Sequence, residues 1–137
     1  MRAKTSITSC LVLLLVLIAP DYADSATQED FLVRNAEDLT RLCSTPKDDP
    51  LYVPAIHFCT GYLVGAYQFH ESLNSGPDAQ PLVCPPNNPK PTRNQAIADF
   101  IAWAKAHSEY NKDRAVDVMF RYMVEKWPCE QRTGTTK

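Results

Sequence analysis

The chain has 137 residues, of which 45% are hydrophobic and 22% are charged, and its formal net charge at pH 7 is -2. A mildly acidic chain with scattered charges lacks the basic surface that nucleic acids and anionic membranes attract, so neither partner is expected. Its length is that of one domain with a single hydrophobic core.

The first 25 residues have the features of an export signal. Arg2 and Lys4 precede the apolar run LVLLLVLIA at 11–19, and the small residues ADSA follow at 23–26. The run is about half of the ~20 residues needed to span a bilayer, which argues against the alternative of an uncleaved anchor. We therefore expect residues 1–25, with Cys10, to be removed as a signal peptide, and residues 26–137 to form a single exported domain.

Four cysteines follow the predicted signal: Cys43, Cys59, Cys84 and Cys129. An even number of cysteines in an exported chain predicts two disulfides. Zinc is the alternative, but the gaps between the cysteines contain neither C-x-x-C nor H-x-x-x-H, and oxidation would remove the thiolates that zinc requires. We expect no bound metal.

The mature chain is predicted to be helical, because no stretch of four or more residues alternates as a strand does. The first helix should run from about 28 to 43, opened by the capping-box residues Thr27 and Asp30. Two prolines in STPKDDP at 44–50 end it. The second helix should span about 54–73 and end at NSGP.

Residues 76–91 contain six prolines, which predicts an extended loop pinned at Cys84. The third helix begins at Thr92, with Gln95 as its capping-box partner, and a polar turn at HSEYNKD leads to a fourth helix over about 112–126. Their apolar faces are Ile97, Phe100, Ile101 and Ala104 in the third helix and Ala115, Val118, Met119, Tyr122 and Met123 in the fourth.

The order of the helices favours one disulfide pairing among the three that sequence allows. If consecutive helices lie antiparallel, the end of the first and the start of the second meet, as do the start of the third and the end of the fourth. This favours Cys43 with Cys59 and Cys84 with Cys129. The predicted fold is an all-α, disulfide-stapled bundle of about four helices.

The stretch HFCTGYLVGAYQFH at 57–70 is apolar nearly all round, which predicts a helix buried in the core. Gly61 and Gly65 lie one helical turn apart, with Tyr62 between them in the sequence. Each glycine costs roughly 1 kcal/mol relative to alanine in a helix, so we expect a neighbouring helix backbone to pack closely against them. The alternative is a self-association surface.

The histidines do not form a site. His57 and His70 are separated by about 20 Å along one helix and cannot share a metal ion, and His107 suits the end of a helix. No recognisable nucleophile, H-E-x-x-H motif or glycine-rich phosphate loop is present. We expect a protein that is not an enzyme, with no catalytic residue and no cofactor.

Several segments carry a family resemblance: LC at 42–43, FCTGYLVGAYQ from 58, VCPP from 83, FIAWAKAHSE from 100 and RAVDVMFRYMVEKWPC ending at 129. In their order and spacing the chain resembles the type VI amidase immunity (Tai) and resistance-associated immunity protein family, from about residue 31 to 129. It departs from the family where Ser108 replaces the usual proline after His107 and where prolines crowd the loop before Cys84.

The resemblance implies a periplasmic helical protein, often a homodimer, that binds a peptidoglycan-cleaving amidase effector of type VI secretion and occludes its active site. The candidate contact surfaces are the loop at 74–91 and the turn at 108–112, with these residues to test: Asp78, Gln80, Glu109, Tyr110 and Asn111. An acid-stress-type periplasmic chaperone, or an envelope protein without an effector, is the alternative. A hydrolase would require a role for His57 or His70.

Overall fold

The computed structural model describes residues 25–129, and the predicted signal, apart from Ser25, lies outside the described residues. The described chain holds four α-helices and no strand, as predicted for an all-α fold. The helices are α1 (Ala36–Ser44), α2 (Tyr52–Leu73), α3 (Arg93–Ala106) and α4 (Ala115–Lys126), with the short 3-10 helices η2 (Gln28–Leu32) and η3 (Ser108–Tyr110).

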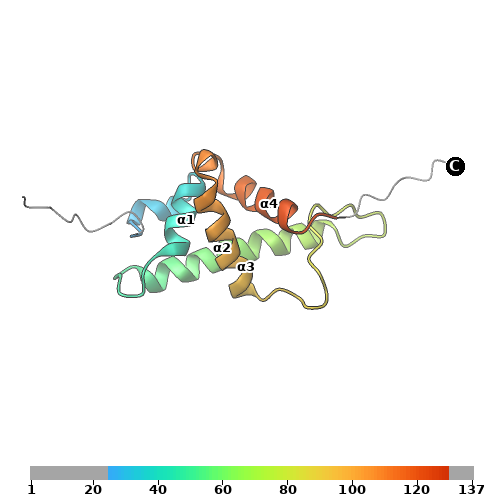
Figure 1. Cartoon of the computed structure of the whole chain (residues 1–137), viewed down its shortest axis with the longest axis horizontal. Helices are drawn as coiled ribbons and strands as arrows, with labels where there is room; N and C mark the ends of the chain where they lie inside the picture. The colour runs from blue at the N-terminus through green and yellow to red at the C-terminus, as the bar shows by residue number, and fades with distance from the viewer. Residues whose placement is uncertain (1–24, 130–137) are drawn as a thin grey trace, which may run out of the picture.

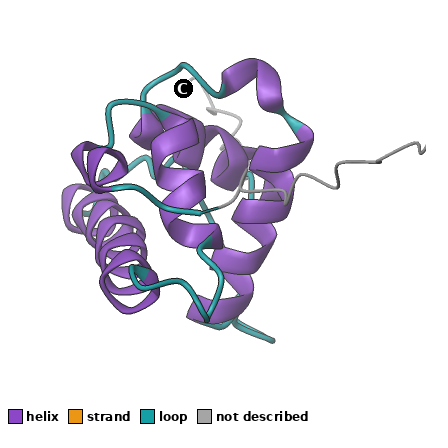
Figure 2. Ribbon diagram, turned by 90° about the vertical axis from the view of Figure 1, so that its left-hand side faces the viewer, coloured by secondary structure: helices purple, strands orange, loops and turns teal. Residues whose placement is uncertain are grey.

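Figure 1 shows α2 running along the length of the molecule, while α1 and α3 stand side by side across it and α4 lies over one end. Figure 2 gives the same arrangement from the side. Consecutive helices therefore cross instead of running antiparallel. The main core draws on all four helices and on one loop residue: Ala36, Leu39, Cys43, Cys59, Leu63, Val83, Phe100, Ala104, Ala115, Val118, Met119, Tyr122 and Met123.

The predicted first helix is broken in two. Thr27 and Asp30 form the expected capping box, but it opens only η2, because Val33 takes a left-handed conformation with φ of 44°. A new helix start forms at Asn35, whose side chain accepts the N–H of Asp38 at 3.0 Å. The prediction of one helix over 28–43 is therefore wrong, because a second capping residue lies inside the same apolar pattern.

The turn before α4 completes the cap of α1. The carbonyls of Asp113 and Asn111 accept the N–H groups of Ala36 and Glu37 at 2.9 and 3.0 Å. These are two of the four N–H groups that a helix leaves free at its start. The Glu37 carboxylate also pairs with Lys112, so the turn and α1 hold each other in place.

The third and fourth helices carry the predicted apolar faces. α3 begins at the expected capping box of Thr92, and Phe100 and Ala104 are buried. All five residues predicted for the face of α4 are buried. α4 begins at Ala115 and not at 112, since Arg114 is extended, with a ψ of 134°.

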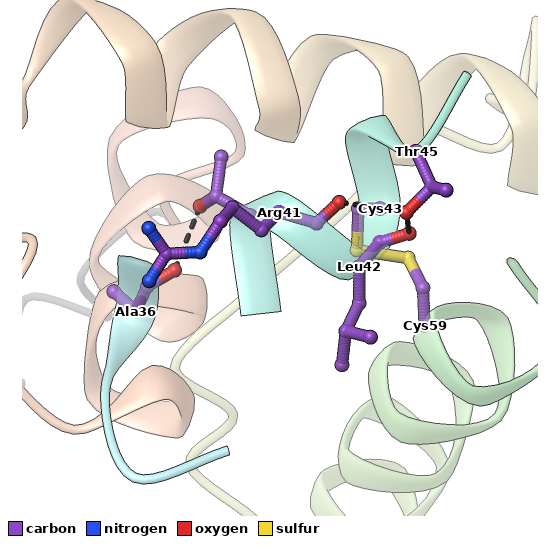
Figure 3. Close-up of a disulfide and its surroundings, with 7 residues drawn as sticks. Ala36, Arg41, Leu42, Cys43, Thr45 and Cys59 are labelled. Atoms are coloured by element: carbon purple, nitrogen blue, oxygen red, sulfur yellow. Dashed lines mark hydrogen bonds between the residues drawn. A yellow bond between two sulfur atoms is a disulfide. The ribbon is translucent and has the colours of Figure 1, made fainter. Parts of the chain in front are cut away.

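Two disulfides staple the helices with the predicted pairing. Cys43 of α1 bonds Cys59 of α2 with their Cα atoms 5.2 Å apart, and both residues are buried. Figure 3 shows this bond beside the last turn of α1, where the Thr45 hydroxyl donates to two carbonyls at 3.0 and 3.1 Å. Cys84 of the proline-rich loop bonds Cys129 after α4, with their Cα atoms 4.9 Å apart.

One face of α2 is uncovered, contrary to the expectation of a fully buried helix. Gly61 and Gly65 are exposed, and a Cβ on either would meet no neighbouring atom within 4 Å outside its own helix backbone. Phe69 and Leu73 continue this face and are 66% and 68% exposed. The expected close packing at the glycines is thus absent among residues 25–129, although Tyr62 does pack against the core.

Each helix in the described range is too short or too polar to cross a bilayer.

Candidate partner-binding site

The loop at 76–91, here called the proline loop, is fastened to the helices at its middle. The N–H of Leu82 donates to Nε2 of His70 at 3.0 Å, and the buried His70 ring lies against two aromatic rings. Two residues further on, the N–H of Cys84 donates to the carbonyl of Trp127 at 2.9 Å, and its sulfur is in the second disulfide. The proline loop has no regular secondary structure, but its course is fixed.

Both predicted contact residues of the proline loop are accessible. Asp78 and Gln80 are exposed, and they lie between the end of α2 and the anchor at Leu82. Leu82 itself is 59% exposed, although its backbone is held by His70. The loop therefore presents polar and apolar side chains to solvent from a fixed backbone.

A groove of about 270 Å³ lies between the proline loop and the helices. Its floor is apolar and continuous with the core, and it includes Leu63, Ala96, Phe100, Met119, Met123 and Trp127. A pocket with an apolar floor at the meeting point of several elements is a typical binding site.

The two cationic side chains beside the groove have no ion-pair partner among the described residues. Lys90 and Arg93 line it and are exposed, and neither forms an ion pair with another residue in the described range. Glu71, the third charged lining residue, lies on α2 near Tyr67; burial raises the pKa of the Tyr67 hydroxyl, and the Glu71 carboxylate raises it further. The rim is therefore positive on the side of the proline loop.

The second predicted surface, the turn at 108–112, is mainly engaged within the molecule. The ring of Tyr110 lies 6.0 Å from that of Trp103, and the Arg121 guanidinium sits 4.3 Å above it. The carbonyl of Asn111 caps α1. Only the side chain of Glu109 is exposed among the three predicted residues of this turn.

The two predicted surfaces lie at opposite ends of α3. The proline loop leads directly into the start of α3, and η3 follows its end, so the 14 residues of the helix separate them (Figure 1). A helix of this length spans about 21 Å. The structure therefore groups Asp78 and Gln80 but does not bring Glu109, Tyr110 or Asn111 to the same place.

The three histidines occupy separate environments. His57 is exposed on α2, whereas His70 is buried, and its Nδ1 has no hydrogen-bond partner among the described residues. His107 lies at the end of α3, where its Nδ1 is 2.8 Å from the Trp103 carbonyl, as expected for a histidine in the last turn. Across residues 25–129 no group of three or more potential metal ligands comes together.

Sequence reasoning missed three residues of this site. His70 was considered as a metal ligand and as a catalytic candidate, yet it anchors the proline loop through Leu82. Nothing in the sequence singled out Lys90 and Arg93, because single cations in a polar segment look like ordinary surface residues. Lys90 and Arg93 lie beside an apolar groove because the proline loop returns over α2.

Fold and site together define a small helical protein, stapled by two disulfides, whose fixed loop and apolar groove are suited to binding another protein. Residues 35–129 match the model of the Rap1a immunity proteins. The chain belongs to this family, which is a family of immunity proteins against type VI effectors. Comparisons with curated proteins and with solved structures gave no match.

Proposed function

We propose that the protein is a periplasmic immunity protein that binds a peptidoglycan-cleaving amidase effector and fills its active-site cleft with the proline loop. One observation carries the proposal beyond family membership. The proline loop is fixed at Leu82 and Cys84, while Asp78 and Gln80 remain exposed. Such a loop can enter a cleft without first being ordered.

The mechanism is occlusion, which needs neither a catalytic residue nor a cofactor of this protein. A loop that is rigid before binding loses less conformational entropy on association, and this favours tight binding. Asp78 and Gln80 are the main proposed contacts. Glu109 is proposed as a second contact, with Tyr110 and Asn111 holding its turn in position.

Two features support export to the periplasm. The apolar run at 11–19 follows basic residues, as in a cleaved signal. The two disulfides require an oxidising compartment, and the bacterial periplasm is one. An immunity protein in this compartment stands between an incoming effector and the peptidoglycan.

The first test is capture followed by inhibition. Residues 26–137, tagged, serve as bait for the envelope and secreted proteins of the producing organism, and each retained hydrolase is purified and assayed on peptidoglycan. We expect one amidase to be retained at a 1:1 ratio and to lose its activity in the complex. A retained protein whose activity is unaffected, or capture of many unrelated proteins only in acid, would contradict the proposal.

The second test asks which surface contacts the amidase. The double variant Asp78→Ala with Gln80→Ala should weaken the complex by at least about tenfold, as expected for central interface residues. Glu109→Ala should have a smaller effect. Asp48→Ala is the matched control, because Asp48 is an exposed aspartate outside both surfaces. Equal affinity of the double variant and the control would remove the proline loop from the interface.

We also propose that the protein forms a homodimer through the uncovered face of α2. Gly61, Gly65, Phe69 and Leu73 form an exposed stripe without charge, and exposed apolar surface of this kind is typical of interfaces. Gly65→Lys should give a monomer by analytical ultracentrifugation, whereas Ala98→Lys, on the exposed side of α3, should not. A wild-type chain that sediments as a monomer at all concentrations would rule the dimer out.

A further inference from the structure

The groove beside the proline loop has a size and a lining that the contacts proposed above do not use. Its volume of about 270 Å³ is smaller than the range of roughly 300–1,000 Å³ of pockets for drug-sized molecules. It is therefore suited to one large side chain. Leu63, Phe100 and Met123 in its floor belong to the rigid core, so the groove does not need to form during binding.

The electrostatics of the groove select the kind of side chain that it can receive. Lys90 and Arg93 line one side and have no ion-pair partner among residues 25–129. The first turn of α3 beside them contains no acidic residue, and the start of a helix carries a partial positive charge. Glu71, the third charged lining residue, lies on α2, and its single negative charge against the two cations leaves the lining with one net positive charge.

From these observations we propose that the groove is an anchor site for one bulky apolar side chain of the protein partner, placed next to a carboxylate of the partner that pairs with Lys90 and Arg93. The inference rests on the proposed function, in which the partner is an amidase effector. The proline loop and the groove would then contact the partner together, the loop entering its cleft and the groove holding a projecting residue.

The anchor predicts a preference that small probes can report. Indole-3-propionate combines an aromatic ring with a carboxylate, and indole-3-propionamide is its neutral counterpart. We expect nuclear magnetic resonance titrations to show weak binding of the acid, with shifts at Leu63, Ala96 and Met123, and binding of the amide that is weaker by about fivefold or more. In the double variant Lys90→Ala with Arg93→Ala the two probes should bind equally. Shifts elsewhere on the molecule, or no preference in the wild-type chain, would overturn the proposal.

Variants then connect the groove to the partner. Ala96→Phe fills the groove and should weaken the complex with the captured amidase by about thirtyfold or more, as for loss of a central anchor. Ala98→Phe places the same side chain on the exposed side of α3 and should change the affinity by less than about threefold. The charge reversal Lys90→Glu with Arg93→Glu keeps the fold in place, because both side chains are exposed, and should also weaken the complex.

The outcomes separate this inference from the proposed function. If the amidase binds both phenylalanine variants equally, the anchor is wrong while the immunity function stands. If no amidase is captured but the acid probe still prefers the groove, the proposed function fails while the groove retains its preference for an apolar acid. Micromolar binding of the free probe would overturn the anchor, since it would indicate a site for a small molecule.

Discussion

At the scale of single residues, Asp30 is one of two aspartates in the described range with the same deep burial, since Asp30 and Asp38 are each 2% exposed. Burial alone would raise the pKa of Asp30. Hydrogen bonds from the Thr27 N–H at 2.7 Å, the Thr27 hydroxyl at 2.9 Å and the Arg41 guanidinium at 3.1 Å outweigh burial and lower the pKa below its ordinary value. Both carboxylate oxygens are thus used, and they tie η2 to α1.

We expect Asp30→Ala to lower the free energy of unfolding by about 2 kcal/mol, because it leaves the Arg41 Nε and the Thr27 donors without their acceptor, while Arg41 keeps its pair with Glu37 at 2.9 Å. Glu29→Ala removes the neighbouring exposed carboxylate, which pairs with Arg34 at 3.7 Å, and should cost less than about 0.5 kcal/mol. Urea unfolding of both variants measures the difference. Equal losses would mean that the Asp30 network contributes no more than a surface ion pair.

Tyr122 differs from Asp30, because its buried polar group, the hydroxyl, lacks a hydrogen-bond partner in the described range. Its residue is 3% exposed, and its hydroxyl has no hydrogen-bond partner among the described residues. Burial, with the nearby Asp99, raises the pKa of Tyr122 to about 12. The neutral hydroxyl is favoured in the folded state, so the linked stability is present below the ordinary pKa of about 10 and is lost as the pH rises towards 12.

Tyr122→Phe should therefore leave the stability at pH 7 unchanged or raise it by up to about 1 kcal/mol, because a buried unpaired hydroxyl is removed. The variant should also lose stability less steeply between about pH 10 and 12. Tyr67→Phe is the contrasting control, because the Tyr67 hydroxyl interacts with the Glu71 carboxylate, which raises its pKa in addition to burial, and it should cost about 0.5–1 kcal/mol. A clear destabilisation by Tyr122→Phe would show that an ordered water or another group satisfies the hydroxyl.

At the scale of elements, the two disulfides differ in their surroundings. Cys43 and Cys59 are 5% and 1% exposed, whereas Cys84 lies on the surface beside the proline loop. Reduction requires access of a thiolate to sulfur. We expect mild dithiothreitol, followed by alkylation and peptide mapping, to open Cys84–Cys129 first and to leave Cys43–Cys59 intact until denaturant is added. Reduction in the reverse order would contradict the burial of the α1–α2 junction.

Opening Cys84–Cys129 should also release the proline loop. The bond closes a span of 45 residues, and a loop of this size stabilises the fold by roughly 4 kcal/mol in the chain-entropy model. Amide exchange at Leu82 should become faster in the double variant Cys84→Ser with Cys129→Ser, since only non-covalent anchors would still hold the loop: His70, the buried Val83 and the backbone bond from position 84 to Trp127. Unchanged exchange would show that these anchors are sufficient without the disulfide.

The elements that sequence predicted well are those with a local cause. The capping box at Thr92 and the face of α4 follow from side chains near one another along a helix. The cysteine pairing was also predicted correctly, although the antiparallel packing from which it was inferred is replaced by crossing helices (Figure 1). The break at Val33 was missed, because the apolar spacing continues across it and only the competing cap at Asn35 divides the helix. The spacing of apolar residues could not show that part of α2 is uncovered. Such spacing identifies which face of a helix is apolar, but not whether another element packs against that face.

At the scale of the whole molecule, the site required tertiary contacts that sequence does not contain. The proline loop itself was predicted, but its anchor at His70 and the groove below it depend on how the loop returns over α2. The turn at 108–112 was predicted as a free surface, whereas its Asn111 carbonyl, together with that of Asp113, caps α1, which lies more than 60 residues earlier in the chain. Contacts between distant segments therefore decide which polar residues remain available to a partner.

The response of the whole molecule to acid distinguishes an immunity protein from an acid-stress chaperone. The pKa of Glu37 is lowered, mainly by its hydrogen bond from Lys112, and that of Asp30 is lowered as described above. A carboxylate whose folded-state pKa is depressed contributes stability above its ordinary pKa of about 4, and this stability is lost as the pH falls through the folded-state value. The free energy of unfolding should thus be nearly constant from pH 7 to about 5 and decline below about pH 4.

Because both disulfides persist in acid, we expect this decline without exposure of a surface that binds other proteins. Urea unfolding between pH 7 and 2.5 measures the decline, and the Asp30→Ala variant should show a smaller slope below about pH 4, since it lacks one of the titrating carboxylates. Light scattering of an acid-denatured globular enzyme measures chaperone activity in the same range. Suppression of its aggregation at stoichiometric ratios would favour the chaperone, whereas acid loss of stability without suppression is the behaviour of a specific binding protein that works near neutral pH.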